Sequence, residues 1–353
     1  SSAKPKKCSF PGTCIAIDSL DSPLYFGSHS QAAKDLEIMT LLSICVPSFN
    51  DSAMLQKTLD NLLSIAEIPN IEVVISDNNS TDNSREVLAS FDKASQGRFI
   101  EHVQKSNLGF RGNIAFLSSV ATGDYVWFLG IGECINHAAI APILEALNRY
   151  KPTNFVVSGI VSNELSPFSG SLTVVSSKDE PSTPLFSETI SLNIIKRELA
   201  LTSLQQGSSA SGDYWPHLEA ILEARGHEKE RANSLFAAEP IVSISPNLDG
   251  WWFDRDGAYN LSLAQIEILA AHDREPVSTP WLKRRLYRMR AVGLGEIILR
   301  SRKNGKEFSG DELNTIRQRA KLGLWLQIPL ILAAKTPLRI FAVLAPIARR
   351  LKL

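Results

Sequence analysis

Two short acidic loops hold the residues of this sequence that are best placed to do chemistry. Residues 76–82 include Asp77 and Asp82, and residues 130–133 end in a single carboxylate, Glu133. Each loop follows an apolar run typical of a buried strand. A carboxylate at the end of such a strand can hydrogen-bond a nucleobase or a ribose, and it can ligate a divalent cation that bridges two phosphates.

Both loops also have a purely structural interpretation. Polar residues of these types turn the chain and cap helices. We prefer this structural role for Asp82, whereas for Asp77 the structural and the functional interpretation stay level. The signal at Glu133 is weak, because one isolated glutamate at a strand end is usually only solvated.

The elements that must position these loops alternate between strand and helix from residue 41 onward. Strands are expected at 41–46, 71–76, 98–104, 125–129 and 154–159, and helices at 51–65, 81–91, 113–121 and 138–149. This alternation predicts an α/β fold with a mostly parallel sheet that helices cover on both faces. Ligands bind such sheets at the carboxyl ends of the strands, so we expect the site in the loops after Val46, Ser76 and Leu129.

Local signals set the expected boundaries. We expect Pro47 to close the first strand, Asp51 or Ser52 to cap the first helix, and Ser80 or Thr81 to cap the second. The later segments are expected to form loops and edge strands at 160–190, helices at 191–226 around a flexible loop at 207–212, a helix at 261–271 and a linker at 276–280.

Length and composition exclude several protein classes. A chain of 353 residues with 44% hydrophobic and 21% charged residues can bury the cores of about two domains, which excludes a disordered chain and a fibrous repeat. Four cysteines without a C-x-x-C pair predict neither a disulfide framework nor a zinc site, so we expect a reduced, cytosolic-side protein. We expect no simple membrane span and no signal peptide.

A net charge of zero hides an uneven distribution. Residues 281–353 hold 17 Lys and Arg against 4 Asp and Glu, a balance of +13, so the preceding 280 residues carry −13. A basic tail is attracted to anionic surfaces. Residues 281–303 are basic and amphipathic, and residues 322–353 hold short, broken apolar stretches, which favours helices lying in the interface of an anionic membrane.

Two alternatives for this tail stay open. It can form a basic helical bundle packed on the rest of the chain, or it can make a homo-oligomer contact. A nucleic-acid partner is not expected, because the tail has no interleaved stacking pattern.

Four sequence blocks follow one another in a familiar order. They are VPSFN at 46–50, VVISDNNSTD at 73–82, KSNLGFRGN at 105–113 and ATGDYVWFL at 121–129. This order resembles the family 2 glycosyltransferases, which have the GT-A fold with a Rossmann-like nucleotide-binding sheet. Within the family it is most similar to abequosyltransferase-like enzymes of surface polysaccharide and lipopolysaccharide assembly.

The resemblance implies a domain organisation. It is strong over residues 39–150 and loose over 150–270. It implies a GT-A catalytic domain at 39–275, with a nucleotide-sugar half at 39–150 and an acceptor half at 151–275, followed by a basic amphipathic helical region at 276–353. Residues 1–38 fall outside it and are expected to be weakly ordered, either as a genuine arm or as residues before the true start at Met39.

The resemblance also implies a donor site, residue by residue. The implied donor-binding residues are Pro47, Ser48 and Asn50 in the nucleotide pocket, Asp77 at the base or ribose, Asn107, Gly109 and Asn113 beside the nucleotide, and Arg111 at a phosphate. The family then has a D-x-D-type cluster, which aligns here with Ile131, Gly132 and Glu133. Glu133 is therefore the implied metal ligand, but two of the usual three acids are missing. A weaker Mg²⁺ or Mn²⁺ site and metal-independent transfer both stay open.

An inverting transferase also needs a general base for the acceptor hydroxyl. The family places this acid at a helix start, which aligns loosely with residues 212–218. Asp213 is the first candidate and His217 the second, although a histidine there is more often an ordinary polar contact. Asp254 and Asp256 are third choices, and Trp215, Trp251 and Trp252 are candidate sugar-stacking residues on the acceptor side.

These inferences give competing functions. The favoured hypothesis is an inverting hexosyl- or deoxyhexosyltransferase that moves a sugar from a nucleotide-sugar donor to a lipid-linked or polysaccharide acceptor, peripherally bound at the inner face of the cell membrane. The alternative is a catalytically degenerate scaffold that binds a sugar nucleotide or a glycan, which the missing acids at Ile131 and Gly132 support. A dehydrogenase is disfavoured because no G-x-G-x-x-G follows the first strand.

Overall fold

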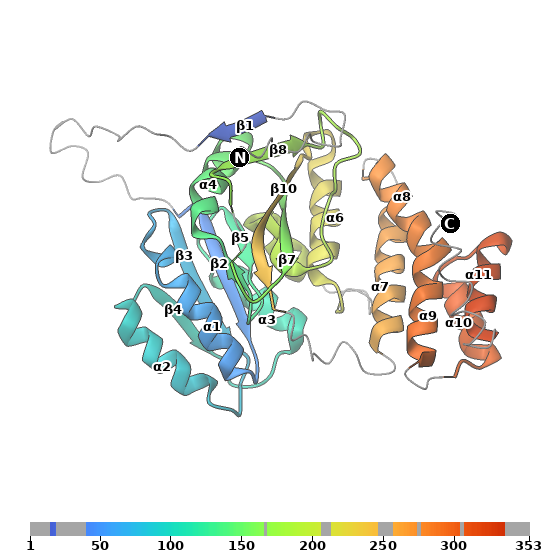
Figure 1. The fold of residues 1–353 in the computed structure, drawn as a ribbon, viewed down its shortest axis with the longest axis horizontal. Helices are drawn as coiled ribbons and strands as arrows, with labels where there is room; N and C mark the ends of the chain where they lie inside the picture. The colour runs from blue at the N-terminus through green and yellow to red at the C-terminus, as the bar shows by residue number, and fades with distance from the viewer. Residues whose placement is uncertain are drawn as a thin grey trace, which may run out of the picture. The chain divides into compact units, whose positions relative to one another are not determined.

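The structure is a computed structural model that describes residues 15–18, 40–165, 168–205, 213–245, 257–273, 277–303 and 307–335. The chain divides into two compact units (Figure 1). The sheet unit comprises residues 1–207 and 216–246, and the helical unit comprises residues 208–215 and 247–353.

Ten strands of the sheet unit form one mixed sheet in the order β1-β8-β10-β7-β9-β5-β2-β3-β4, with β6 paired to β10 (Figure 1). Strands β5, β2, β3 and β4 are parallel, as are β7 and β10, whereas the other pairs are antiparallel. The bounds are β1 (Ile15–Asp18), β2 (Leu42–Ser48), β3 (Ile71–Asp77), β4 (Phe99–Val103), β5 (Tyr125–Phe128), β6 (Cys134–Ile135), β7 (Asn154–Val161), β8 (Ser171–Ser176), β9 (Asn193–Lys196) and β10 (Ser234–Ile244).

Strand β9 differs from two expectations, the helix predicted across this segment and the mostly parallel sheet. Residues 193–196 lie in the segment that was expected to be helical, and β9 runs antiparallel to both β5 and β7. Its side chains Ile194 and Ile195 are almost fully buried. Pairing with two neighbouring strands fixes this short apolar run as a strand, and a run of four residues does not reveal such long-range pairing. The sheet is therefore parallel around β2 and mixed beyond β5.

Strand β2 continues through Pro47 and does not stop there. The ladder with β5 ends at Cys45, whose carbonyl accepts a hydrogen bond from the Leu129 amide at 2.9 Å. Pro47 follows two residues later, so its backbone nitrogen faces the same side of the strand as the Cys45 carbonyl. The ladder with β5 has already ended there, so no partner strand lies opposite Pro47. Its missing N–H therefore costs no ladder bond, and β2 continues along β3 to Ser48.

Helices connect the parallel strands and pack apolar stripes on the sheet. Helix α1 buries Leu55, Leu59 and Leu62 along one face, and Asp51 caps it by accepting a hydrogen bond from the Met54 amide at 3.1 Å, as expected. The helices of this unit are α1 (Ser52–Leu62), α2 (Ser84–Ser95), α3 (Gly109–Val120), α4 (Ile140–Tyr150), α5 (Arg197–Gln205) and α6 (Pro216–Glu228), with short 3₁₀ turns η2 (Ile65–Glu67), η3 (His137–Ala139), η4 (Ile190–Leu192) and η5 (Lys229–Arg231).

Helix α2 starts three residues later than expected, because Asp82 is used elsewhere. Neither Ser80 nor Thr81 caps α2, which begins at Ser84. The Asp82 carboxylate accepts hydrogen bonds from the Ser52 amide at 2.8 Å, the Ser84 amide at 3.1 Å and the Ser84 hydroxyl at 2.6 Å. One side chain thus joins the N-termini of α1 and α2, and the structural interpretation of Asp82 holds.

The helical unit contains α7 (Gly257–His272), α8 (Pro280–Arg288), a π-helical turn η7 (Met289–Gly293), α9 (Leu294–Lys303), α10 (Gly310–Arg319) and α11 (Leu324–Lys335). Pro280 is not part of a linker but opens α8, where proline is favoured because its missing N–H has no partner to lose. Arg319 of α10 holds Glu267 of α7 with two hydrogen bonds, at 2.6 and 2.9 Å. Helix α7 groups with this unit, whereas the sequence placed it with the catalytic domain.

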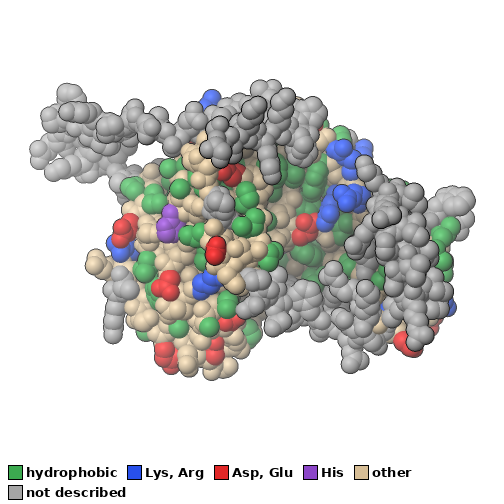
Figure 2. Space-filling model, viewed as in Figure 1, with side chains coloured by type: hydrophobic (Ala, Val, Ile, Leu, Met, Phe, Trp, Pro, Cys, Tyr) green, Lys and Arg blue, Asp and Glu red, His purple; other side chains and the backbone are tan. Residues whose placement is uncertain are grey.

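On the face drawn in Figure 2, acidic side chains lie scattered, whereas several Lys and Arg side chains gather beside a group of hydrophobic ones. Among the described residues, no helix combines the length and the apolar character that a bilayer crossing needs.

The Asp82 clamp predicts a pH-dependent stability effect. Partial burial raises the pKa of Asp82, but hydrogen bonds from Ser84 and Ser52 outweigh it and bring the pKa below its ordinary value. A lowered pKa stabilises the fold above the unfolded value of about 3.9, and this contribution is lost as the pH falls through the folded value. Asp82→Asn should therefore lower the free energy of unfolding by about 1 kcal/mol at pH 7, and by much less near pH 3.

Urea unfolding at both pH values measures this difference. Asp60→Asn, at an exposed carboxylate of α1, is the matched control and should change the free energy of unfolding by less than about 0.5 kcal/mol. A penalty for Asp82→Asn that is equal at pH 7 and pH 3 contradicts the prediction.

Candidate functional site

The carboxyl ends of β2 and β3 bring the predicted donor residues together. Ser48 lies directly opposite Asp77 in the parallel register, and the Asn78 amide donates to the Ser48 carbonyl at 2.9 Å. Asn113 of α3 donates from its side-chain amide to the Ser76 carbonyl at 3.3 Å. Ser48, Asp77 and Asn113 are all buried. Side chains from the first, second and third sequence blocks therefore meet at this edge.

Asp77 is held in one orientation. Its carboxylate is completely buried and accepts a hydrogen bond from the Ser80 amide at 3.2 Å. Arg85 of α2 places Nε 3.7 Å from Asp77 Oδ2, and the arginine side chain is 51% exposed. Asp77 thus turns the chain into the 78–81 loop and has a cation beside it. Its contact with a nucleotide remains a prediction.

Asn78 fixes the start of α3, a role that the sequence did not single out. Its side-chain oxygen accepts from the Leu108 amide at 2.8 Å, and its side-chain nitrogen donates to Asn107 Oδ1 at 2.9 Å. Asn107 Oδ1 also accepts from the Gly109 amide at 2.8 Å. Gly109 has φ +70°, a conformation that disfavours residues with a side chain. The predicted pair Asn107 and Gly109 therefore forms a tight turn that Asn78 holds against β3.

Asn50 ties the loop after β2 to the loop after β3. Its side-chain oxygen accepts a hydrogen bond from the Thr81 backbone amide at 2.8 Å, and its backbone amide donates to the Ser80 hydroxyl at 2.9 Å. Its φ of +50° is one that asparagine tolerates better than most residues. Asn50 therefore shapes the predicted pocket through the backbone of its neighbours.

Two buried polar atoms at this edge have no hydrogen-bond partner among the described residues. They are the hydroxyl oxygen of Ser48 and the side-chain oxygen of Asn113. Leaving a buried polar group unsatisfied costs about 1–3 kcal/mol. Such groups call for an explanation beyond packing, and a bound ligand or an ordered water molecule supplies one.

Arg111 is engaged with protein partners. Its guanidinium donates to Glu219 of α6 at 2.7 Å and to the Ser203 carbonyl of α5 at 3.2 Å. Arg111 and Glu219 are mostly buried. The ion pair fastens α3 to α5 and α6, and the predicted phosphate contact of Arg111 remains a prediction.

The residues at the D-x-D position do not fit a divalent-cation site. Glu133 is buried and accepts hydrogen bonds from the Gly130 amide at 3.1 Å and from the Ser191 hydroxyl. Burial raises the pKa of the Glu133 carboxyl. Ile131 and Gly132 supply no oxygen side chain, and no group of three or more metal-ligating side chains occurs in the described part of the chain.

The two base candidates differ in environment. His217 of α6 is buried, and its Nε2 lies 3.1 Å from the Glu188 carbonyl oxygen. Burial lowers the pKa of His217 to about 3. A group with so low a pKa is a weak base, which weighs against His217 as the general base. Asp213 is exposed and groups with the helical unit.

The acceptor candidates are only partly described. Trp215 is half-buried and donates its indole N–H to the Leu261 carbonyl of α7 at 2.7 Å. This contact fastens the residue within the helical unit, and its stacking role remains a prediction. Trp251, Trp252, Asp254 and Asp256 lie outside the described residues.

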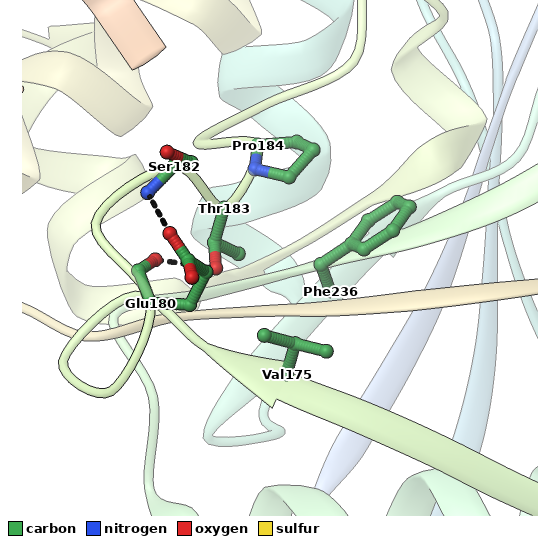
Figure 3. A pocket seen from close by; sticks show the side chains of 6 residues that line it. All are labelled: Val175, Glu180, Ser182, Thr183, Pro184 and Phe236. Atoms are coloured by element: carbon green, nitrogen blue, oxygen red, sulfur yellow. Dashed lines mark hydrogen bonds between the residues drawn. The ribbon is translucent and has the colours of Figure 1, made fainter. Parts of the chain in front are cut away.

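A small pocket lies on another part of the sheet (Figure 3). It is bounded by β8, β10 and the turn at 180–184, where the Ser182 amide donates to Glu180 Oε1 at 3.0 Å. In the sheet order, β7, β9 and β5 separate β10 from β2. This pocket is therefore distinct from the edge that gathers the predicted donor residues. Its lining residues are Val175, Glu180, Ser182, Thr183, Pro184 and Phe236.

Comparison with known proteins agrees with the sequence blocks. Residues 43–190 match the family model described as Glycosyl transferase family 2. The chain is similar to abequosyltransferase RfbV of Salmonella typhimurium, with 29% identity over 102 residues, which are 29% of this chain and 31% of that protein. It is also similar to GalNAc(5)-diNAcBac-PP-undecaprenol beta-1,3-glucosyltransferase of Campylobacter jejuni, with 26% identity over 110 residues, 31% of this chain and 35% of that protein. The chain spans about a third of the length of these curated relatives.

Among solved structures, the chain is similar to mannosyltransferase PcManGT from Pyrobaculum calidifontis, solved in complex with GDP-Man and Mn²⁺. The TM-score is 0.53 at 15% sequence identity, and the match covers 83% of this chain and 85% of that chain. The family match, the order of the four sequence blocks and the arrangement of the sheet agree: residues 43–190 match a family 2 glycosyltransferase domain, and the sheet has the GT-A fold.

Proposed function

We propose that this chain transfers a sugar from a nucleotide-sugar donor to a lipid-linked or glycan acceptor. The observation that carries the proposal is the meeting of Ser48, Asp77 and Asn113 at the carboxyl ends of β2 and β3. Two of these buried side chains, Ser48 and Asn113, carry polar atoms that have no hydrogen-bond partner among the described residues. In open α/β sheets this edge is where ligands bind, and a polar, partly unsatisfied lining there suits a nucleotide.

The proposed reaction is a direct displacement with inversion. The acceptor oxygen forms a bond to the anomeric carbon as the bond from that carbon to the diphosphate breaks. The acceptor proton moves to a carboxylate general base, and the nucleoside diphosphate leaves. Asp213 is our candidate for this base, because it is an exposed carboxylate and His217 has a depressed pKa.

A non-catalytic role remains a second candidate on one specific observation. Ile131 and Gly132 replace two acids at the position where the family carries its D-x-D cluster. A chain that bound a sugar nucleotide or a glycan without turning it over would serve as a scaffold for other transferases. Donor binding without any turnover is the outcome that favours this function.

We further propose that the acceptor is lipid-linked and that the helical unit docks on an anionic membrane surface. The printed name of the Campylobacter relative includes an undecaprenol-linked glycan. In this chain, Ile328, Ile331 and Leu332 share one face of α11 and are each about half exposed. The exposed Lys321 and Lys335 lie just before and at the end of α11. An apolar strip between lysines suits insertion at a headgroup boundary.

Turnover tests the proposed base. With UDP-, GDP-, CDP- and dTDP-linked sugars as donors and a lipid-linked acceptor, Asp213→Asn should lower kcat about 100-fold or more, because positioned general bases contribute about 10²–10⁴ in rate. Donor affinity should stay unchanged. Release of nucleoside diphosphate measures the rate. His217→Asn is the matched control and should leave the pH profile of the remaining activity unaltered. Equal loss of turnover in both variants contradicts the assignment of Asp213.

Donor affinity tests the role of Asp77. Asp77→Asn should weaken nucleotide-sugar binding about tenfold or more, since a hydrogen bond to a charged partner contributes about 1.5–3 kcal/mol. Isothermal titration calorimetry measures the affinity. Asp82→Asn, in the same loop, should lower stability and leave the affinity nearly unchanged. The prediction fails if both aspartate variants bind the donor equally well.

Vesicle flotation tests the membrane proposal. Replacing Ile328, Ile331 and Leu332 together by serine should weaken binding to phosphatidylglycerol-containing vesicles about tenfold or more, because three apolar side chains lose their insertion. The matched control replaces the exposed Ile100 and Val103 of β4 by serine and should bind like the wild type. Unchanged flotation of the α11 variant would exclude the strip as the docking surface.

A further inference from the structure

The loop at 130–133 has a backbone conformation at Gly132 that disfavours an acid at this position of the D-x-D alignment. Gly132 has φ +86°, which favours glycine over every L residue with a side chain. A Cβ on Gly132 would lie 2.9 Å from Met54 Sδ of α1. The Gly132 amide also donates to the Met54 carbonyl at 3.1 Å and to the Thr58 hydroxyl at 2.8 Å. This position is therefore built for glycine and not for an aspartate that faces a ligand.

The other glycine of the loop makes room for the Glu133 carboxylate. A Cβ on Gly130 would lie 3.1 Å from both Cδ and Oε2 of Glu133. The glutamate side chain therefore folds back over its own loop, where Oε2 accepts from the Gly130 amide at 3.1 Å. The Glu133 amide donates in turn to the Gly130 carbonyl at 3.2 Å, which closes the turn.

The Glu133 carboxylate also joins the loop to the segment before β9. Ser191 of η4 donates its hydroxyl to Glu133 Oε2, and the same hydroxyl oxygen lies 2.9 Å from the Gly130 amide. The Ser191 carbonyl accepts the indole N–H of the fully buried Trp127 at 2.7 Å. Thr58 of α1 donates to the Glu133 carbonyl at 3.1 Å. The Glu133 carboxylate thus joins the loop to η4, and backbone carbonyls of Glu133 and Ser191 extend the hydrogen-bonded network to α1 and β5.

We infer that Glu133 is a structural clamp of this loop and not a metal ligand, so that the donor binds without a divalent cation held by this loop. To ligate a cation through Oε2, the carboxylate would have to leave both Ser191 and Gly130. Ligation through either oxygen would also require the carboxylate to become accessible from its buried position. Its loop neighbours Ile131 and Gly132 could not complete the coordination, because neither carries an oxygen side chain. Divalent cations of this kind favour several oxygen ligands.

Direct metal titration tests the inference without any nucleotide. Mn²⁺ binding to the full chain can be measured by electron paramagnetic resonance. We expect the wild type and Glu133→Gln to bind Mn²⁺ equally, with no site that depends on Glu133. Glutamine keeps the size and the hydrogen-bonding of the side chain and loses the charge that a cation needs. A single Mn²⁺ site that is present in the wild type and at least tenfold weaker in Glu133→Gln overturns the inference.

Stability provides the second readout. Glu133→Ala and Ser191→Ala should each lower Tm by several degrees, because each breaks the clamp and leaves a buried partner unsatisfied. Glu133→Gln should recover most of the loss, since its side-chain oxygen can still accept from Gly130 or Ser191. If Glu133→Ala, Ser191→Ala and Glu133→Gln all have the Tm of the wild type, the proposed structural role of Glu133 is contradicted.

Donor binding gives the third readout, which rests on the proposed function. The Kd for the preferred nucleotide sugar should agree within about twofold in Mn²⁺, Mg²⁺ and EDTA, and in Glu133→Gln. A tenfold or larger loss in EDTA that Glu133→Gln reproduces overturns the inference and leaves the transferase proposal intact. If no nucleotide sugar binds under any condition, the transferase proposal fails, and the Mn²⁺ titration and the Tm series still decide the role of Glu133.

Discussion

The parallel pairing of β2 with β3 is the constraint on which the rest of the site depends. Its register places Ser48 beside Asp77, and it brings the two loops that follow these strands within hydrogen-bonding distance of each other. Asn50 and Asp82 then cross between the loops, each accepting from backbone amides of the other side. These contacts use side chains from the first and second sequence blocks. The two blocks therefore lie side by side at one edge of the sheet.

The loop after β5 follows a different rule. At the β2 and β3 ends, polar side chains lie buried with unsatisfied atoms, as at a site that awaits a ligand. At the β5 end, Oε2 of the Glu133 carboxylate accepts hydrogen bonds from Gly130 and Ser191. In our proposal, the first two loops therefore form the nucleotide-facing part of the family pattern, whereas the loop at the cation-facing position is a structural turn. This division is why we place the specificity of the site in the first two loops.

Much of the fold could be predicted, because local signals agreed with long-range packing in the first half of the chain. Strong apolar periodicity marked α1, and short apolar runs marked β2, β3 and β5. The prediction was wrong where distant partners decide the outcome. Residues 193–196 become a strand only because β5 and β7 are available on both sides, and α2 starts late because Asp82 turns toward Ser52.

The site was predictable to a similar depth. The blocks identified Ser48, Asp77 and Asn113, but no local signal marks the partners that hold other candidate residues in place. Glu219 lies 108 residues along the chain from Arg111, and Ser191 lies 58 residues from Glu133, so neither pairing is visible in local spacing. Asn78 was missed although it lies next to Asp77, because its role depends on the turn at Asn107 and Gly109.

The central claim is that the sheet edge at Ser48 and Asp77 binds a nucleotide sugar. The most direct measurement is the Tm of the intact chain with UDP-, GDP-, CDP- and dTDP-linked sugars at saturating concentration. A ligand at about 100 times its Kd stabilises the fold by roughly 2.7 kcal/mol, enough to raise Tm by several degrees. We predict such a rise with one class of nucleotide sugar. An unchanged Tm with all four classes would contradict the account.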